Sequence, residues 1–395
     1  MDLSYGTEAE QFRGELTTWL AENLPAAWRE PGFWQQTDPD EGFRLRREWE
    51  AEKARAGLAG IAWPVEYGGR GGTPAQKAVY DEEMARARAP LTVNGLGLTY
   101  LAPTVMAIGT HEQKRDIVRP LLHNEVIWCQ GFSEPDTGSD LASVSTRAVA
   151  DGDEYVVDGQ KVWTSNARHA DRMFALVRTS QEERKHEGLT MLLVDLHRPG
   201  VEVRPLKQMS GALDFGEVFL SGVRVPRTQV LGREGEGWQV AMLLLSFERG
   251  ASGIGQYTTF RRELDDIVGL AHRLERDGRP AAHDPVLRQR IAQSVIELET
   301  LRLHAQHVLT KVEQGQDLGA ESSLTKLQWS ETHQDLGELF TDVAGPDHQV
   351  RHPADGLDLA ALQRAFLWSR SETIWGGSSQ VQRSIVAERV LGLPR

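Results

Sequence analysis

The order of hydrophobic patterns along the chain constrains its fold most strongly. Up to about residue 125, apolar residues such as Phe12, Leu16 and Leu20 recur at the spacing of one helix face. Residues 126–238 instead hold short β-rich runs such as "RMFALVRTS" and "LTMLLVDL", bounded by Gly, Pro and Asp. Helical spacing returns after residue 238 and continues to the end of the chain. Blocks of helix, strand and helix predict an α+β fold and not alternating βαβ units.

Chain length supports a division into domains at these changes of pattern. The chain has 395 residues, which is too long for one simple core. We therefore expect an N-terminal helical domain over 1–125, a middle antiparallel β-domain over 126–238 and a C-terminal helical bundle over 239–395. A hydrophobic content of 40% and a charged content of 26% are ordinary for a soluble globular protein.

Charge and cysteine content exclude several classes of function. A net charge of −13 argues against non-specific binding to nucleic acid or to an acidic membrane surface. Cys129 is the only cysteine, so neither an intrachain disulfide nor a Cys-rich metal site can form, and we predict no metal site. The acidic N-terminus is unlike a signal peptide, and no apolar run approaches the roughly 20 residues of a membrane span. We expect a reduced, cytoplasmic protein.

Two common phosphate-binding motifs are absent. The sequence has no G-x-x-x-x-G-K-[ST], and no G-x-G-x-x-G lies between a strand and a helix, which argues against Walker and Rossmann sites. The glycines of "GASGIG" at 250–255 lie inside a helical pattern. There they are expected to permit close helix packing or close approach of a ligand.

Three motifs, in a fixed order, resemble those of one enzyme family. They are "CQGFSEPDTGSD" at 129–140, "KVWTSNA" at 161–167 and "GSSQVQRSIVAERVLG" at 377–392. Together they resemble the acyl-CoA dehydrogenase family, and the resemblance covers nearly the whole chain. The family fold is a helical domain, a β-domain and a helical bundle, the same order that the hydrophobic pattern predicts.

The first two motifs are suited to a flavin. Hydroxyls and backbone N–H groups on a turn-rich loop can point towards a polar ring or a pyrophosphate, although such a loop can also be plain surface. The resemblance implies that Phe132, Ser133 and Ser139 line FAD, with Ser139 near the pantetheine and phosphate side of the substrate. It further implies that Trp163 and Ser165 flank the flavin ring, and that Trp163 covers one face.

The third motif implies further contacts to FAD and raises a question about catalysis. Ser378 and Gln380 resemble residues that reach FAD, while their alternative role is helix capping. The reaction implied is α,β-desaturation of an acyl-CoA thioester, with electrons passed to an electron-transferring flavoprotein. In this reaction, the resemblance implies that the backbone N–H of Gly376 polarises the thioester oxygen of the substrate. However, Gly376 and Gly377 stand where the family usually carries its carboxylate base.

Glu248 is the best replacement for that base. It lies in "LSFERGASG", and partial desolvation by its apolar neighbours would raise its pKa to a useful value. Some family members carry the base on this helix immediately before an arginine, as in Glu248-Arg249, and these tend to take branched, long or polycyclic acyl chains. Arg249 would contact the substrate or Glu248, and a local Glu-Arg pair at the helix surface is the alternative. Glu372 is a weaker candidate for the base.

The chain departs from the family at the contacts that complete a neighbour's FAD site. Leu274 replaces an arginine and Asp277 an aromatic residue, and Ala344-Gly345 replaces a glycine pair. An aspartate beside a pyrophosphate is repulsive. We therefore expect an α2β2 heterotetramer with a related subunit, or else a homotetramer with remodelled contacts. Two other functions stay open: a catalytically silent partner subunit, and a flavin monooxygenase or oxidase of the same fold.

Overall fold

The computed structural model describes residues 5–30, 32–248, 253–316, 318–350 and 359–394. The chain forms two compact units. The helical unit comprises residues 1–38, 72–90 and 249–395, and the sheet unit comprises 39–71 and 91–248. Residues expected to form one N-terminal helical domain therefore contribute to both units. Across the described ranges, no helix combines the length and apolar character that a membrane crossing needs.

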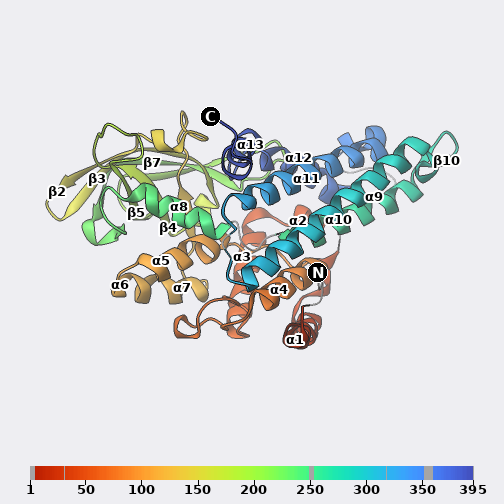
Figure 1. Ribbon diagram of the computed structural model, residues 1–395, viewed down its shortest axis with the longest axis horizontal. Coiled ribbons are helices and arrows are strands. Elements are labelled where there is room, and N and C mark those ends of the chain that lie inside the picture. Colours follow the sequence, from red (N-terminus) through yellow and green to blue (C-terminus); the bar gives the residue numbers. More distant parts are fainter. Residues whose placement is uncertain (1–4, 31, 249–252, 317, 351–358, 395) are drawn as a thin grey trace. The chain divides into compact units, whose positions relative to one another are not determined.

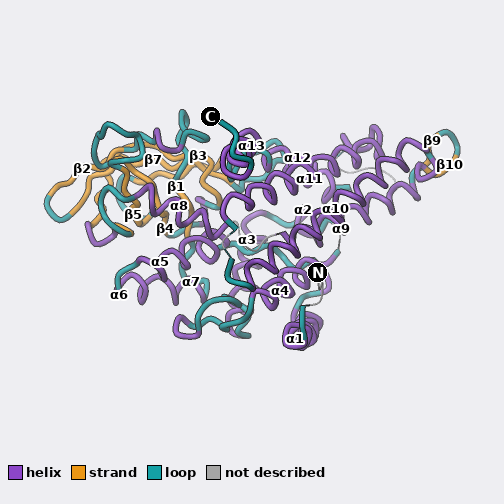
Figure 2. The backbone as a smooth tube through the Cα atoms, viewed as in Figure 1, coloured by secondary structure: helices purple, strands orange, loops and turns teal. Residues whose placement is uncertain are grey.

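One large sheet dominates the sheet unit (Figure 2). Its strands run in the order β6-β7-β3-β2-β4-β5-β8, with β1 paired to β4. Their bounds are β1 Trp128–Gly131, β2 Arg147–Asp151, β3 Glu154–Ser165, β4 Arg172–Arg178, β5 Leu189–Asp195, β6 Val201–Leu206, β7 Phe215–Pro226 and β8 Val230–Leu231. Most neighbours are antiparallel, as expected. Two are parallel: β1 with β4, and a single residue pair that joins β2 to β4.

Strand β4 lies at the centre of this unit and is buried on both faces. Phe174 and Leu176 belong to one apolar cluster, and Met173, Ala175 and Val177 belong to the other. Such continuous burial explains why "RMFALVR" reads as an unbroken apolar run and not as an alternating one.

Helices cover one side of the sheet. Helix α8 (Gly237–Glu248) packs on β4 and β5 (Figure 1). The same apolar cluster includes residues of α5 (Ala102–Ile108) and α7 (Arg119–Leu122). The short α6 (His111–Gln113) and the longer α3 (Pro39–Arg55) also belong to this unit.

The helical unit is built on helices of very different lengths. They are α1 Thr7–Asn23, α2 Phe33–Gln36, α4 Pro74–Arg86, α9 Gly253–Arg273, α10 Pro285–Glu313, α11 Ser322–Ala344, α12 Ala360–Glu372 and α13 Ser379–Ile385. Helices α9, α10 and α11 lie side by side, with α12 along α11 (Figure 1). A small hairpin, β9 (Glu275–Arg276) and β10 (Arg279–Pro280), joins α9 to α10. Helix α10 begins where the Asp284 carboxylate accepts the N–H of Val286 at 2.8 Å.

The glycines of "GASGIG" permit close helix packing where they are described. A Cβ on Gly253 would lie 3.0 Å from the Cβ of Ala305 in α10, and one on Gly255 would lie 3.2 Å from the Cβ of Asp81 in α4. Both approaches are closer than ordinary side-chain contacts, so α9 meets its neighbours through these glycines. The first three residues of the motif lie outside the described residues.

Candidate functional site

The first two motifs meet at the ends of strands β1 and β3. The Val162 N–H of β3 donates a hydrogen bond to the Ser133 carbonyl oxygen, just after β1, at 2.9 Å. Beyond Ser133 the chain makes a tight turn in which Glu134 and Thr137 exchange two backbone hydrogen bonds, with Pro135 at the second position. Proline there presets the backbone of such a turn, so the local sequence explains its shape.

Trp163 adopts an unusual backbone conformation at this point. Its φ is 57°, and the pairing of β3 with β7 shifts register between Lys161 and Thr164. A left-handed conformation is uncommon for a bulky residue, and a bulge re-aims the side chain that it carries. The Trp163 indole is 61% exposed and meets the ring of Phe215 edge-on at 6.1 Å. A large apolar ring held exposed by a strained backbone is a feature of ligand sites.

A buried ion pair joins the two motifs. Lys161 Nζ donates to Glu134 Oε1 at 2.8 Å, to the Phe132 carbonyl at 3.1 Å and to the Leu176 carbonyl at 2.6 Å. The Glu134 carboxylate also accepts the N–H and hydroxyl of Ser145 and the N–H of Thr146. Every polar proton of the ammonium group thus has an acceptor, which a buried charge requires.

The two members of this pair respond differently to burial. Burial raises the pKa of Glu134, but the Lys161 charge and the hydrogen bonds to its carboxylate outweigh that effect and lower the pKa to about 2. Burial lowers the pKa of Lys161 to about 8 despite the attraction of Glu134. Both residues stand inside the quoted motifs, but a spacing of 27 residues gives no indication of contact, so their pairing could not be predicted from the sequence.

The other predicted residues of this unit differ in exposure. Ser133 and Ser165 are half-buried, and Ser139 is exposed in the loop after β1. Phe132 is buried, with its ring edge-on to Phe174 at 6.0 Å. Its ring therefore belongs to the apolar core.

Helix α8 ends at the predicted base. Ala241 and Leu244 are buried in the core of the sheet unit, and Glu248 is the last residue of the helix. The side chain of Glu248 and the whole of Arg249 lie outside the described residues.

In the helical unit, the glycines that replace the usual base form a turn between α12 and α13. Gly376 has φ 65° and Gly377 has φ 89°, a conformation that favours glycine. Gln382 Nε2 donates to the Gly376 carbonyl at 2.8 Å. Ser378 is the N-cap of α13 and its hydroxyl accepts the Val381 N–H at 3.3 Å, while Gln380 is exposed. The capping role that the sequence offered for Ser378 is thus present.

Two of the residues that depart from the family, Leu274 and Asp277, have local structural roles. Asp277 and Gly278, with φ 52° and 76°, form the two-residue turn between β9 and β10. Asp-Gly is among the pairs that this turn type prefers. Leu274 is partly buried and packs against the core of the helical unit. The positive φ at 277 would be strained for a bulky aromatic residue.

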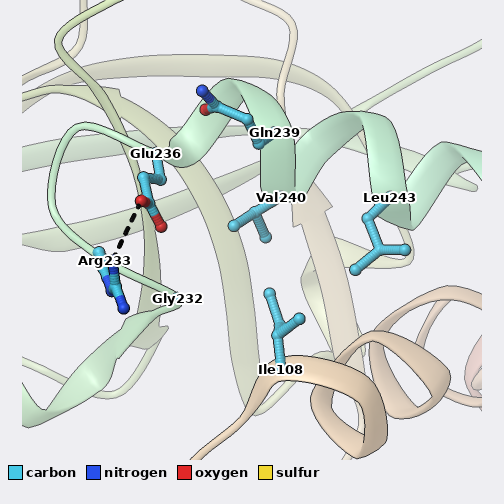
Figure 3. Close-up of a pocket in the computed structure, with 7 residues that line it drawn as sticks. All are labelled: Ile108, Gly232, Arg233, Glu236, Gln239, Val240 and Leu243. Atoms are coloured by element: carbon cyan, nitrogen blue, oxygen red, sulfur yellow. Dashed lines mark ion pairs between the residues drawn. The ribbon is translucent and has the colours of Figure 1, made fainter.

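A shallow pocket lies beside α8 in the sheet unit (Figure 3). It is lined by Ile108, Gly232, Arg233, Glu236, Gln239, Val240 and Leu243. Arg233 and Glu236 form an ion pair at its rim, with 3.8 Å between Nη1 and Oε1. None of the predicted site residues lines this pocket, and it adds no reactive group to them.

Comparison with known proteins covers the whole chain. Family models for acyl-CoA dehydrogenase match three segments: the N-terminal domain at residues 6–125, the middle domain at 129–223 and the C-terminal domain at 235–391. Acyl-CoA dehydrogenase IpdE1 of Mycobacterium tuberculosis is 43% identical over 392 residues, and the match covers 98% of each chain. The IpdE1 protein of Mycolicibacterium smegmatis is 41% identical over 399 residues, again with 98% of each chain covered.

Two solved structures are similar over their full length. The Tcur3481-Tcur3483 steroid ACAD is 32% identical, with a TM-score of 0.86 and 100% of both chains covered. The ChsE4-ChsE5 complex from Mycobacterium tuberculosis is 30% identical, with the same TM-score and coverage.

Proposed function

The chain belongs to the acyl-CoA dehydrogenase family, and we propose that this oxidoreductase desaturates the CoA thioester of a polycyclic, steroid-like acid at its α,β-bond. The substrate class is supported by the similarity to a steroid ACAD over the full length of both chains. The paired glycines 376 and 377 agree with it, because they leave room where other family members carry a larger side chain. We place the activity in the cytoplasm.

One observation carries the proposal of a flavin site: the exposed indole of Trp163 on a bulge, beside the Ser133 loop. These residues fit FAD, because the indole offers a flat apolar face and the adjoining loop offers hydroxyls and N–H groups. Trp163, Ser165, Ser133 and the Phe132 backbone would hold the ring system, and Ser139 would lie towards the CoA portion of the substrate. When bound, FAD supplies the acceptor for the hydride that leaves the β-carbon.

Ser378 and Gln380 are proposed as further FAD contacts from the helical unit. Gln380 is exposed on the first turn of α13, so its amide is available to a ligand. The Ser378 hydroxyl accepts from Val381, which leaves its own proton for a second partner.

The proton chemistry is assigned to Glu248 and Gly376. Glu248 ends an apolar helix, and a carboxylate at such a place is a candidate general base that removes the α-proton. Arg249 would contact the substrate or orient Glu248. The Gly376 N–H would donate to the thioester oxygen as negative charge develops there, which lowers the barrier to proton removal.

Assembly with a related subunit is the favoured arrangement. Leu274 packs in the core and Asp277 forms a turn, so neither replaces the arginine and aromatic contacts that complete a neighbour's FAD site. A structural neighbour is the ChsE4-ChsE5 complex, which contains two different chains. We propose an α2β2 heterotetramer, with a homotetramer as the alternative, that passes electrons to an electron-transferring flavoprotein.

Anaerobic reduction of the flavin tests this function. The FAD-loaded protein would be mixed with a steroid CoA thioester that has a saturated side chain, and the loss of the flavin's visible absorbance would be followed. We expect reduction without oxygen, and a loss of about 10³-fold or more in rate for Glu248→Gln, because no base remains.

The other outcomes identify the alternative functions. No reduction by any acyl-CoA, with rapid oxygen consumption by chemically reduced flavin, would indicate a monooxygenase or oxidase. An unchanged rate for Glu248→Gln in a complex whose partner subunit carries its own base would indicate a silent subunit.

A further inference from the structure

A buried histidine of the helical unit lies between two carboxylates. His333 of α11 has its Nδ1 2.5 Å from Glu372 Oε2, at the end of α12, and its Nε2 3.0 Å from Glu263 Oε2, on α9. The ring of Phe260 stacks on the imidazole at 4.2 Å. His333 and Glu372 are each only 5% exposed, so this cluster belongs to the core and not to a solvated surface.

The geometry defines the charge of the cluster. Each ring nitrogen of His333 faces a carboxylate oxygen, so both nitrogens carry a proton when both carboxylates are ionised. Burial lowers the pKa of His333, but the charges of Glu263 and Glu372 and their hydrogen bonds raise it to about 10. At neutral pH a doubly protonated imidazolium therefore ties three helices together.

Glu372 is also the residue from which the glycine turn begins. Lys326 Nζ donates to the Glu372 carbonyl at 2.6 Å, and Gln334 Nε2 donates to Thr373 Oγ1 at 2.8 Å. Both donors come from α11, the helix that carries His333. Helix α11 therefore fixes the side chain, the carbonyl and the next residue at the entry to the turn.

The far side of the turn is fixed as well. The Ser379 N–H donates to the Thr373 carbonyl at 3.0 Å, and Gln382 holds the Gly376 carbonyl. The Gly376 peptide therefore lies between two backbone segments that are each held in place by hydrogen bonds. A shift of α12 along α11 would move that peptide directly.

We propose that Glu372, held by His333, is a positioning residue that fixes the glycine turn so that the Gly376 N–H points at the substrate's thioester oxygen. This inference rests on the proposed function. In this proposal Glu372, four residues before Gly376, does not remove the α-proton. Its carboxylate is buried and hydrogen-bonded to His333.

A pair of isosteric variants isolates this role. Glu372→Gln and Glu263→Gln each remove one carboxylate charge from the same imidazole, so a purely structural cluster would lose similar stability and activity in both. Only Glu372 lies on the segment that leads into the turn. We expect flavin reduction to slow about tenfold or more for E372Q and about threefold or less for E263Q, at comparable losses of Tm.

A vibrational measurement reports on the Gly376 contact itself. The probe is the enoyl-CoA product of the thioester that reduces the wild-type flavin, labelled with ¹³C at its carbonyl and bound to the oxidised holoenzyme. A hydrogen bond from Gly376 lowers the C=O stretching frequency. We expect this lowering to shrink in E372Q and to persist in E263Q and in E248Q, which lacks only the proposed base.

Each possible result either supports the positioning role of Glu372 or overturns it. Equal rates and equal C=O frequencies in E372Q and E263Q would overturn the positioning role. A loss of about 10³-fold in E372Q with an unchanged C=O frequency would make Glu372 the base and overturn it as well. If the wild type is not reduced by acyl-CoA, the proposed function fails instead. Should E372Q not load FAD, Glu372→Asp keeps the charge but shortens its reach, and a wild-type rate and frequency in that variant would overturn the proposal.

Discussion

At the residue scale, the Lys161–Glu134 pair holds the loop that follows β1. Lys161→Met removes the ammonium group and leaves the Glu134 carboxylate buried without its ion-pair partner. We expect a loss of about 3–5 kcal/mol in the free energy of unfolding, together with loss of FAD. Urea unfolding would measure the change in the free energy of unfolding. The double variant Lys161→Met/Glu134→Gln should recover part of that loss, whereas a double variant no more stable than K161M would contradict the explanation.

The same pair predicts sensitivity to acid. The pKa of Glu134 falls from 4.5 to about 2 on folding, so the unfolded chain binds more protons at this site between those values. The stabilisation is complete above about pH 4.5 and is lost as the pH falls towards about 2. Unfolding free energies measured from pH 6 to 3 should therefore drop more steeply in the wild type than in Glu134→Gln. Parallel curves would show that other carboxylates dominate.

Replacing Trp163 by glycine should weaken FAD binding without lowering the stability of the fold. Its left-handed backbone conformation strains the fold, and its indole is mostly exposed, so Trp163→Gly should raise stability by about 1 kcal/mol or leave it unchanged. FAD affinity should fall about tenfold, which corresponds to about 1.4 kcal/mol of lost ring contact. Trp163→Phe, which keeps an aromatic face, should retain most of the affinity. A destabilised W163G with normal FAD binding would make Trp163 a structural residue.

At the scale of one element, helix α9 carries two kinds of glycine. Gly255 faces Asp81 of α4 closely, whereas a Cβ on Gly269 would meet nothing within 4 Å. Gly269→Ala should raise the free energy of unfolding by about 0.5–1 kcal/mol, because alanine favours the helix. Gly255→Leu should lower it by about 1–3 kcal/mol through overpacking. Thermal unfolding of the two variants measures both changes in stability. Similar changes would show that helix propensity alone determines them.

At the scale of the whole molecule, the FAD content tests the assembly. Under the proposed heterotetramer, the chain purified alone should hold well below one FAD per chain, because Leu274 packs against the core and Asp277 forms a turn. Adding a related subunit that carries the arginine and aromatic contacts should restore FAD and produce a tetramer. The ratio of visible to ultraviolet absorbance and the mass in solution measure both. One FAD per chain in a homotetramer would contradict the heterotetramer.

The sequence determined the order of the blocks and the place of the motifs. Helical and strand periodicities are local properties, so the α+β class and the order of helix, sheet and helix followed from them. The turn at Pro135 and the glycines 376 and 377 could also be read directly, because the backbone conformations they permit belong to the residues themselves.

Only the tertiary structure decided which distant residues meet. The parallel pairing of β1 with β4, the contact of Lys161 with Glu134 and the position of His333 between Glu263 and Glu372 all join residues far apart in the chain. Spacing carries no information on such contacts, since they depend on how whole elements pack. The left-handed conformation of Trp163 was equally hidden, because a bulge arises from the register between two strands and not from the residue that occupies it.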